Sequence, residues 1–280
     1  MIKIAVAVAD EKAGPSAFVV WRGFDSSFKK AEQYGYDGIE LALRTRQDIS
    51  EHEIKSLCRQ YHLEISGIST GQVFADLGLN LADPDNGRRA EAVQVLSDLV
   101  KLAGEFGCMV NLGRARGSVA PGQRREQTER LFLDSLSKLL FVAERVGTTI
   151  IVEPVNRYEI NFINTVAQCA DLLKGIKSKY VGIMPDVFHM NIEEKSIGKS
   201  IEEYGDNIRY IHLADSNRLA PGWGHLDFTE VFTALDKIGY AGWASVEILP
   251  EPNPDGAAAH AIKTLQPFLQ RFCGGRKGRG

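Results

Sequence analysis

Eight short apolar runs, rich in β-branched residues, recur along the chain and alternate with segments of helical periodicity. Runs of this length and composition are typical of the buried strands of a parallel sheet. The predicted strands are residues 2–8, 37–41, 63–68, 108–113, 148–153, 181–186, 208–213 and 244–249. The regular alternation of strand and helix therefore predicts an α/β fold.

Apolar residues in the intervening segments recur with the period of an α-helix. The two longest helices, residues 88–107 and 124–147, each end in a glycine, the residue preferred just beyond a helix. Shorter helices are predicted at residues 25–34, 50–61, 164–175, 227–238 and 257–271. Eight strand–helix units without a linker favour a single-domain (β/α)8 TIM barrel over a doubly wound sheet, and no Gly-rich dinucleotide fingerprint follows the first strand.

Domain limits and composition add little to this prediction. We expect one barrel domain over residues 1–273 and a flexible basic tail over residues 274–280. A net charge of -3 favours neither nucleic acid nor a membrane surface as a partner, and no apolar stretch approaches the roughly 20 residues of a membrane helix.

The N-terminal apolar run is too short for a signal peptide. The four cysteines form no CxxC pair, so reduced thiols and a cytoplasmic location are predicted.

The last four predicted strands each carry a polar residue at or near the C-terminal end, where TIM barrels place their chemistry. These residues are Glu153, Asp186, His212 and Glu247, and about one βα unit separates each from the next. Taken alone, each carboxylate is also typical of a helix cap and the histidine of a packed core residue. Because all four lie at matching positions on successive strands, a shared site is favoured. Three neighbouring carboxylates require a cation to remain ionised. One imidazole among carboxylates favours Mn²⁺, Mg²⁺ or Co²⁺, and Zn²⁺ and Fe²⁺ also fit.

Further polar residues lie just beyond strand ends on the same predicted rim. His189 and Arg218 suit the binding of polyol oxygens and the stabilisation of charge on a carbonyl oxygen. Glu159 either binds a terminal hydroxyl group or is a solvated loop carboxylate. Arg114 and Arg116 either recognise a carboxylate or phosphate, or are solvated or ion-paired.

Glu40 is also placed on this rim, and a Gly-rich segment, residues 220–228, suits either a site loop or a structural turn. Asp227 in that segment is expected to start the next helix. Three aromatic residues either cover the pocket or pack in the ordinary way: Phe74, Phe188 and Trp223.

Four motifs in the second half, "VEPVNRYE", "PDVFHMN", "IHLADSNRLAPGWGHLDF" and "SVEIL", carry a family resemblance. The chain resembles, over nearly its whole length, the xylose isomerase-like barrel superfamily of sugar phosphate isomerases and epimerases. It is most similar to the ketose 3-epimerase branch, the D-tagatose and D-psicose 3-epimerases. The resemblance implies a TIM barrel that inverts C3 of a small-molecule sugar or polyol through a cis-enediolate.

The resemblance also implies a role for each matching residue. One divalent ion, Mn²⁺ above all, would be bound by Glu153, Asp186, His212 and Glu247. Glu153 and Glu247 would also be catalytic, since each would transfer a proton on one side of C3. The substrate-binding residues would be His189, Arg218 and Glu159. No nucleic acid or membrane partner is implied, and the family usually forms a homodimer or homotetramer.

The resemblance leaves the substrate open, because the early loops "STGQVFADLGLN" and "GRARGSV" do not specify a sugar. Relatives with the same metal ligands isomerise hydroxypyruvate or inososes, or dehydrate keto acids. The apurinic endonuclease branch is disfavoured, because the ends of the third and fourth strands offer no histidine for further zinc ions. A non-catalytic binding subunit would not need the pair Glu153 and Glu247.

Overall fold

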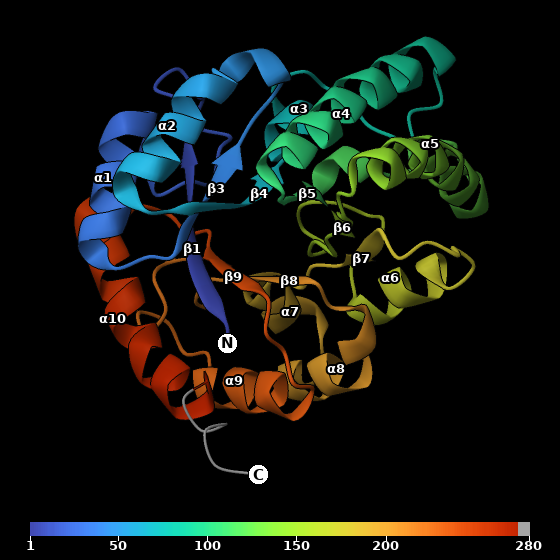
Figure 1. The fold of residues 1–280 in the computed structure, drawn as a ribbon. Coiled ribbons are helices and arrows are strands. Elements are labelled where there is room, and N and C mark those ends of the chain that lie inside the picture. Colours follow the sequence, from blue (N-terminus) through green and yellow to red (C-terminus); the bar gives the residue numbers. More distant parts are fainter. Residues whose placement is uncertain (274–280) are drawn as a thin grey trace.

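The computed structural model describes residues 1–273, which form a barrel of eight parallel strands surrounded by helices (Figure 1). The order of strands around the barrel is β7-β6-β5-β4-β3-β1-β9-β8. Their bounds are β1 Lys3–Ala9, β3 Gly38–Ala42, β4 Glu64–Ser69, β5 Met109–Leu112, β6 Ile150–Val152, β7 Val181–Ile183, β8 Tyr210–Leu213 and β9 Trp243–Val246. All eight predicted strands are therefore confirmed. A short ninth strand, β2 (Trp21–Arg22), pairs with the end of β1 and was not predicted.

Two isolated parallel bridges nearly close the barrel between β7 and β8. One joins Ile183 to Ile208, and the other joins Asp186 to His212. The backbone amide of His212 donates to Pro185 O at 2.9 Å. This junction places two of the predicted metal ligands side by side.

Helices form the outer layer, as expected for a parallel sheet that is buried on both faces (Figure 1). Their bounds are α1 Phe24–Tyr34, α2 Glu51–Tyr61, α3 Gly71–Ala75, α4 Asn86–Phe106, α5 Arg125–Val146, α6 Val166–Leu173, α7 Val187–Glu193, α8 Ile197–Glu203, α9 Phe228–Lys237 and α10 Pro254–Cys273, with 3-10 turns η1 Arg46–Asp48, η2 Arg114–Arg116 and η3 Gly205–Asn207. The seven predicted helices are confirmed within a few residues, whereas α3, α7 and α8 were not predicted. Gly107 and Gly147 end α4 and α5 in the left-handed conformation, with φ of 67° and 74°.

The main apolar core lies between the barrel and its helices and includes the fully buried Phe28, Phe132 and Phe232. A smaller cluster inside the barrel contains Tyr210, whose hydroxyl lies 2.8 Å from Ser66 Oγ. No helix in the described part of the chain is both long and apolar enough to cross a membrane. The tail predicted at residues 274–280 lies outside the described residues, and the domain boundary at residue 273 stays a prediction.

Candidate metal centre and active site

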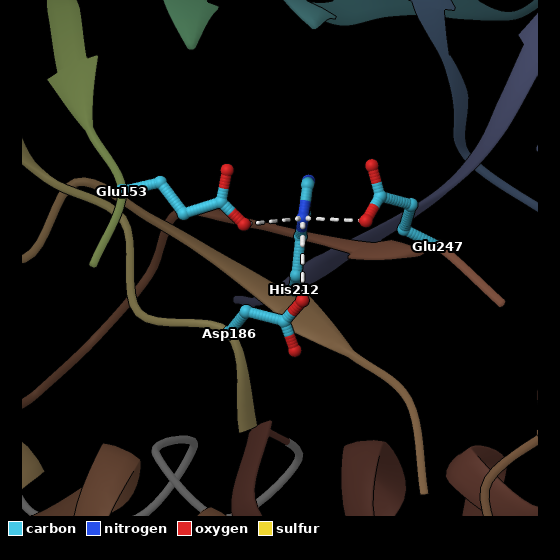
Figure 2. A group of neighbouring side chains, drawn as sticks. All are labelled: Glu153, Asp186, His212 and Glu247. Atoms are coloured by element: carbon cyan, nitrogen blue, oxygen red, sulfur yellow. Dashed lines mark ion pairs between the residues drawn. The ribbon is translucent and has the colours of Figure 1, made fainter. Parts of the chain in front are cut away.

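Glu153, Asp186, His212 and Glu247 converge at the C-terminal end of the barrel. Glu153 and Glu247 directly follow β6 and β9, Asp186 begins α7, and His212 lies within β8. Each residue offers one ligand atom, and these atoms all lie within 4.8 Å of one another. Figure 2 shows Glu153 and Glu247 extending toward the His212 ring from opposite sides, with Asp186 beside it. The structure therefore brings the four predicted ligands into one cluster.

Glu153 is buried against the loop that follows β5. Its Oε2 accepts a hydrogen bond from Asn111 Nδ2 at 2.9 Å, and its Oε1 lies 3.8 Å from His212 Nδ1. A Cβ atom on Gly113 would lie 2.6 Å from Glu153 Oε2, so any larger residue would displace this carboxylate. Asn111 and Gly113 thus fix one oxygen and leave the other directed at the cluster.

His212 is fully buried and held by a carboxylate on the far side of its ring. Its Nε2 lies 3.0 Å from both oxygens of Glu40, to which it donates, so Nδ1 is the nitrogen left to face the cluster. Nδ1 lies 3.6 Å from Glu247 Oε2. Burial alone would lower the pKa of His212, but Glu40 and Glu247 raise it well above its usual value. A carboxylate behind a metal-binding histidine commonly sets its tautomer in this way.

Asp186 caps the N-terminus of α7, since its Oδ1 accepts from the amide of Phe188 at 2.8 Å. Its other oxygen, Oδ2, is buried without a hydrogen-bond partner among the described residues, and so is Nδ1 of His212. Unpaired buried polar atoms are expensive, and these two face each other at 4.0 Å. A divalent cation between them would satisfy both, so the residues present fit a metal ion.

The environment of the cluster shifts the pKa values of its three carboxylates. Burial raises the pKa of Glu153 to about 8, and the nearby Glu247 and Asp186 add to the effect. Burial likewise raises the pKa of Glu247. Burial would raise the pKa of Asp186 too, but nearby basic groups, among them Arg218, outweigh it and lower that pKa. Opposite shifts in neighbouring acids are typical of functional sites.

Arg218 reaches the cluster from the loop after β8, with its backbone in the left-handed region at φ 61°. Its Nη2 donates to Glu247 Oε2 at 2.6 Å, and its Nη1 lies 3.4 Å from Glu159 Oε1. The guanidinium lies between two phenyl rings, 4.1 Å from the centroid of Phe18 and 4.9 Å from that of Phe188. These contacts hold the cation rigidly beside a carboxylate of the cluster.

His189 and Glu159 are joined by Asn156, a residue that we did not predict. Asn156 Oδ1 accepts from the amide of Tyr158 at 3.0 Å, so its Nδ2 must donate to Glu159 Oε1 at 3.0 Å and to His189 Nδ1 at 2.8 Å. His189 Nε2 therefore carries the proton and cannot accept from Arg218 Nη1, which lies 3.5 Å away. His189 Nε2 lies 3.7 Å from Asp186 Oδ2 and 3.8 Å from Glu153 Oε1. Burial lowers the pKa of His189 to about 3, so the ring stays neutral and can donate to a hydroxyl group.

A small cavity of about 40 Å³ lies beside the cluster, and Arg218, His189, Glu159 and Glu247 line part of it. This volume holds one or two water molecules, whereas small-molecule sites usually have several hundred cubic ångströms. The cavity in this structure is therefore smaller than a monosaccharide. A larger hollow of about 620 Å³, lined in part by Asp10, Arg44 and Asp48, contains none of the clustered residues.

Some of the remaining residues of the predicted rim lie at the site, and the others do not. Arg114 and Phe188 lie at the site, Arg114 on the cavity wall and Phe188 against Arg218. Arg116 is fully buried and donates to the backbone oxygens of Gly113, Phe162 and Ile163, so it is structural. Away from the cavity, Asp227 caps α9, Phe74 lies 6.0 Å from the guanidinium carbon of Arg114, and Trp223 stacks on His260.

Comparisons with known proteins agree with this architecture. A family model described as a xylose isomerase-like TIM barrel matches residues 28–268. A probable ketose 3-epimerase of Synechocystis sp. is 30% identical over 230 residues, which cover 79% of this chain and 76% of that protein. A D-psicose 3-epimerase of Ruminiclostridium cellulolyticum is 30% identical over 246 residues, which cover 84% of this chain and 80% of that protein. A solved L-ribulose 3-epimerase has the same fold, with a TM-score of 0.82, 23% identity and both chains fully covered.

Proposed function

The chain belongs to the xylose isomerase-like TIM barrel family, and from this relationship we propose that it is a metal-dependent ketose 3-epimerase. Its homologues include ketose 3-epimerases, which are isomerases. The observation that carries the proposal is the placement of Glu153 and Glu247 on opposite sides of His212 (Figure 2). A carbon atom between these two carboxylates presents one face to each.

Glu153 and Glu247 exchange protons with C3 of the sugar in this proposal. One carboxylate removes the C3 proton, which leaves a cis-enediolate, and the other delivers a proton to the opposite face. The result is inversion of C3 with no net change in protons.

A divalent cation bound by Glu153, Asp186, His212 and Glu247 would act as a Lewis acid on the carbonyl and the adjacent hydroxyl group. We propose Mn²⁺, because three carboxylates and one imidazole suit it, while Mg²⁺ and Co²⁺ suit the same ligands. Measuring the bound metal after dialysis against an equimolar mixture of the three ions tests this choice.

The neighbouring polar residues hold the sugar. Arg218 offers guanidinium N–H groups to a substrate oxygen that becomes negative, and its ion pair with Glu247 and its contacts with two phenyl rings keep it in place. His189 donates from Nε2 to a hydroxyl group, since its Nδ1 accepts from Asn156. Glu159, held by Asn156 and Arg218, accepts from a terminal hydroxyl group.

Deuterium exchange tests the proposal. The protein is incubated with MnCl₂ and D-psicose in D₂O, and we expect the C3 epimer to form with deuterium at C3, as followed by NMR. Glu153→Gln and Glu247→Gln should each slow epimerisation by about 100- to 10,000-fold, since each removes one proton-transfer group. Glu144→Gln, an exposed change on α5, is the matched control and should retain full activity.

The same experiment distinguishes the alternative reactions. A related isomerase would incorporate deuterium without forming a C3 epimer, and a dehydratase acting on a keto acid would release water. Hydroxypyruvate, an inosose and dehydroshikimate are therefore tested beside the ketoses. Absence of carbon-bound deuterium with every substrate would refute the proposal and leave a binding protein.

We further propose that the protein is cytoplasmic and assembles as a homodimer or homotetramer. The free cysteines Cys58, Cys108 and Cys169 support a reducing location. Two large exposed apolar side chains, Phe141 on α5 and Tyr158 after β6, support an interface between copies. Light scattering coupled to size-exclusion chromatography measures the assembly directly.

A further inference from the structure

We propose that Arg114 binds an anionic group, a carboxylate or a phosphate, at the end of the substrate remote from C3. This inference rests on the proposed epimerase function and specifies its substrate class. Arg114 lines the cavity that Glu247 and Arg218 also line. It follows β5, which lies across the barrel from β9, the strand that carries Glu247. A substrate whose C3 lies between Glu153 and Glu247 therefore meets Arg114 with the part that extends along the cavity wall.

Arg114 is partly buried, yet within the described part of the chain its side chain makes no ion pair and no hydrogen bond. Its recorded contact is the Phe74 ring, 6.0 Å from its guanidinium carbon. By contrast, Arg218 on the same cavity pairs with Glu247. An arginine that is withdrawn from water without a counter-ion is costly, so an unpaired one on a cavity wall points to an anionic ligand.

The loop that carries Arg114 is built to be rigid. Arg116, two residues further on, is fully buried and donates to Gly113 O at 2.7 Å, Phe162 O at 2.6 Å and Ile163 O at 2.7 Å. These bonds tie η2 to the loop after β6. Arg116 thus fixes the backbone and cannot reach a ligand, whereas Arg114 faces the cavity with its donors free.

The cavity wall also carries neutral polar groups, while its two carboxylates, Glu159 and Glu247, are both paired with Arg218. Ser69 and Gln72 line it from the end of β4 and from α3, and Ser16 lines it from the loop after β1. Asp76 accepts from Ser16 Oγ at 2.5 Å and from Gln72 Nε2 at 3.2 Å, and no ion pair joins it to Arg114 in the described part of the chain. A guanidinium whose donors are free suits a planar or tetrahedral anion better than a hydroxyl group.

Matched substrates test the inference. Exchange of the C3 hydrogen is measured for a ketose, its terminal phosphate ester and the sugar acid in which the terminal carbon is oxidised. We expect kcat/KM to be about 30-fold higher for one anionic form than for the neutral ketose, since a charged hydrogen-bonded pair contributes that much. The preferred anionic form shows whether the group is a phosphate or a carboxylate.

Arg114→Met should abolish this preference, Arg114→Lys should restore part of it, and Arg124→Met, an exposed arginine before α5, should leave it unchanged. Equal kcat/KM for neutral and anionic forms, or an equal loss for both in Arg114→Met, would overturn the inference. Calorimetry measures the binding of sorbitol and of sorbitol 6-phosphate without any reaction. It therefore tests the Arg114 proposal separately from the epimerase proposal. If no sugar exchanges its hydrogen but Arg114-dependent phosphate binding persists, only the epimerase proposal fails.

Discussion

The Glu40 carboxylate holds His212 from the side of the ring that faces away from the other three acids. It is 1% exposed and also accepts from the Tyr210 hydroxyl at 3.4 Å. This arrangement fixes which imidazole nitrogen can bind a cation. Glu40 therefore acts on the metal through His212 and not by direct contact.

Replacing Glu40 tests this role. Glu40→Gln keeps an acceptor for His212 Nε2 but removes the charge that makes the ring more basic. We expect the dissociation constant for Mn²⁺ to rise about 10- to 100-fold, as measured by isothermal titration calorimetry. Glu64→Gln, an exposed carboxylate at the start of β4, is the control. Unchanged affinity in Glu40→Gln would show that His212 needs no such support.

Metal binding should depend on pH because of Glu153, whose pKa burial raises to about 8. The metal-free group is protonated below that pH, and a cation must displace the proton. The apparent affinity for Mn²⁺ should thus fall about tenfold or more per pH unit below pH 8. Calorimetry at pH 7 in buffers of different ionisation enthalpy should reveal release of a proton from Glu153 and of a further proton from His212, whose pKa is also raised. Release of none would mean that Glu153 is already ionised.

The sequence located Glu153, Asp186, His212 and Glu247 because strand ends can be read from apolar runs, and a barrel brings those ends together. It did not reveal Asn111 or Asn156, which orient the acids through hydrogen bonds. Such contacts depend on side-chain direction across neighbouring strands, which spacing alone does not fix. The asparagine within the apolar run of β5 was the available signal, since a buried amide needs a partner.

At the scale of elements, the loop after β8 is organised by Asp215. This buried carboxylate accepts from the amides of Ser216 at 2.7 Å, Gly222 at 2.7 Å and Leu226 at 3.1 Å. Gly224 passes so close to it that a Cβ atom would collide with the carboxylate. The amide of Arg218 donates to Asp215 O at 2.8 Å, so the same residue anchors the turn that presents Arg218.

Asp215→Asn should disturb this loop, because an amide NH₂ group would then face backbone N–H donors. We expect a loss of about 2 kcal/mol in the free energy of unfolding and a fall of about 10-fold or more in kcat/KM. Mn²⁺ affinity should stay unchanged, because Asp215 touches no ligand of the cluster. Asp227→Asn in the same loop is the control, since asparagine caps a helix as well as aspartate does. An active Asp215→Asn would exclude a positioning role.

The elements missing from the prediction share one property, which is their length. The helices α7 and α8 have 7 residues each and α3 has 5, so none completes enough turns for an apolar period to emerge. Strand β2 has only 2 residues. Missing α7 matters for function, because Asp186 caps this helix and His189 lies within it. The long helices were predictable because their periodicity spans many turns and ends at glycine.

At the scale of the molecule, the cluster draws one residue from each of four consecutive βα units, so its geometry depends on closure of the barrel between β7 and β8. A cation bound by all four residues links these units in the folded state and has no such site in the unfolded chain. Metal binding should therefore stabilise the whole domain and not only the rim.

Removal of the metal tests this coupling. At an Mn²⁺ concentration 100 times its dissociation constant, binding should add about 2.7 kcal/mol to the free energy of unfolding. For a domain of this size that corresponds to a rise of about 5 °C in Tm, which calorimetry with and without EDTA measures. Asp186→Asn, which weakens one ligand, should show a much smaller difference between the two conditions. An equal Tm for wild type with and without metal would mean that no cation joins the four units.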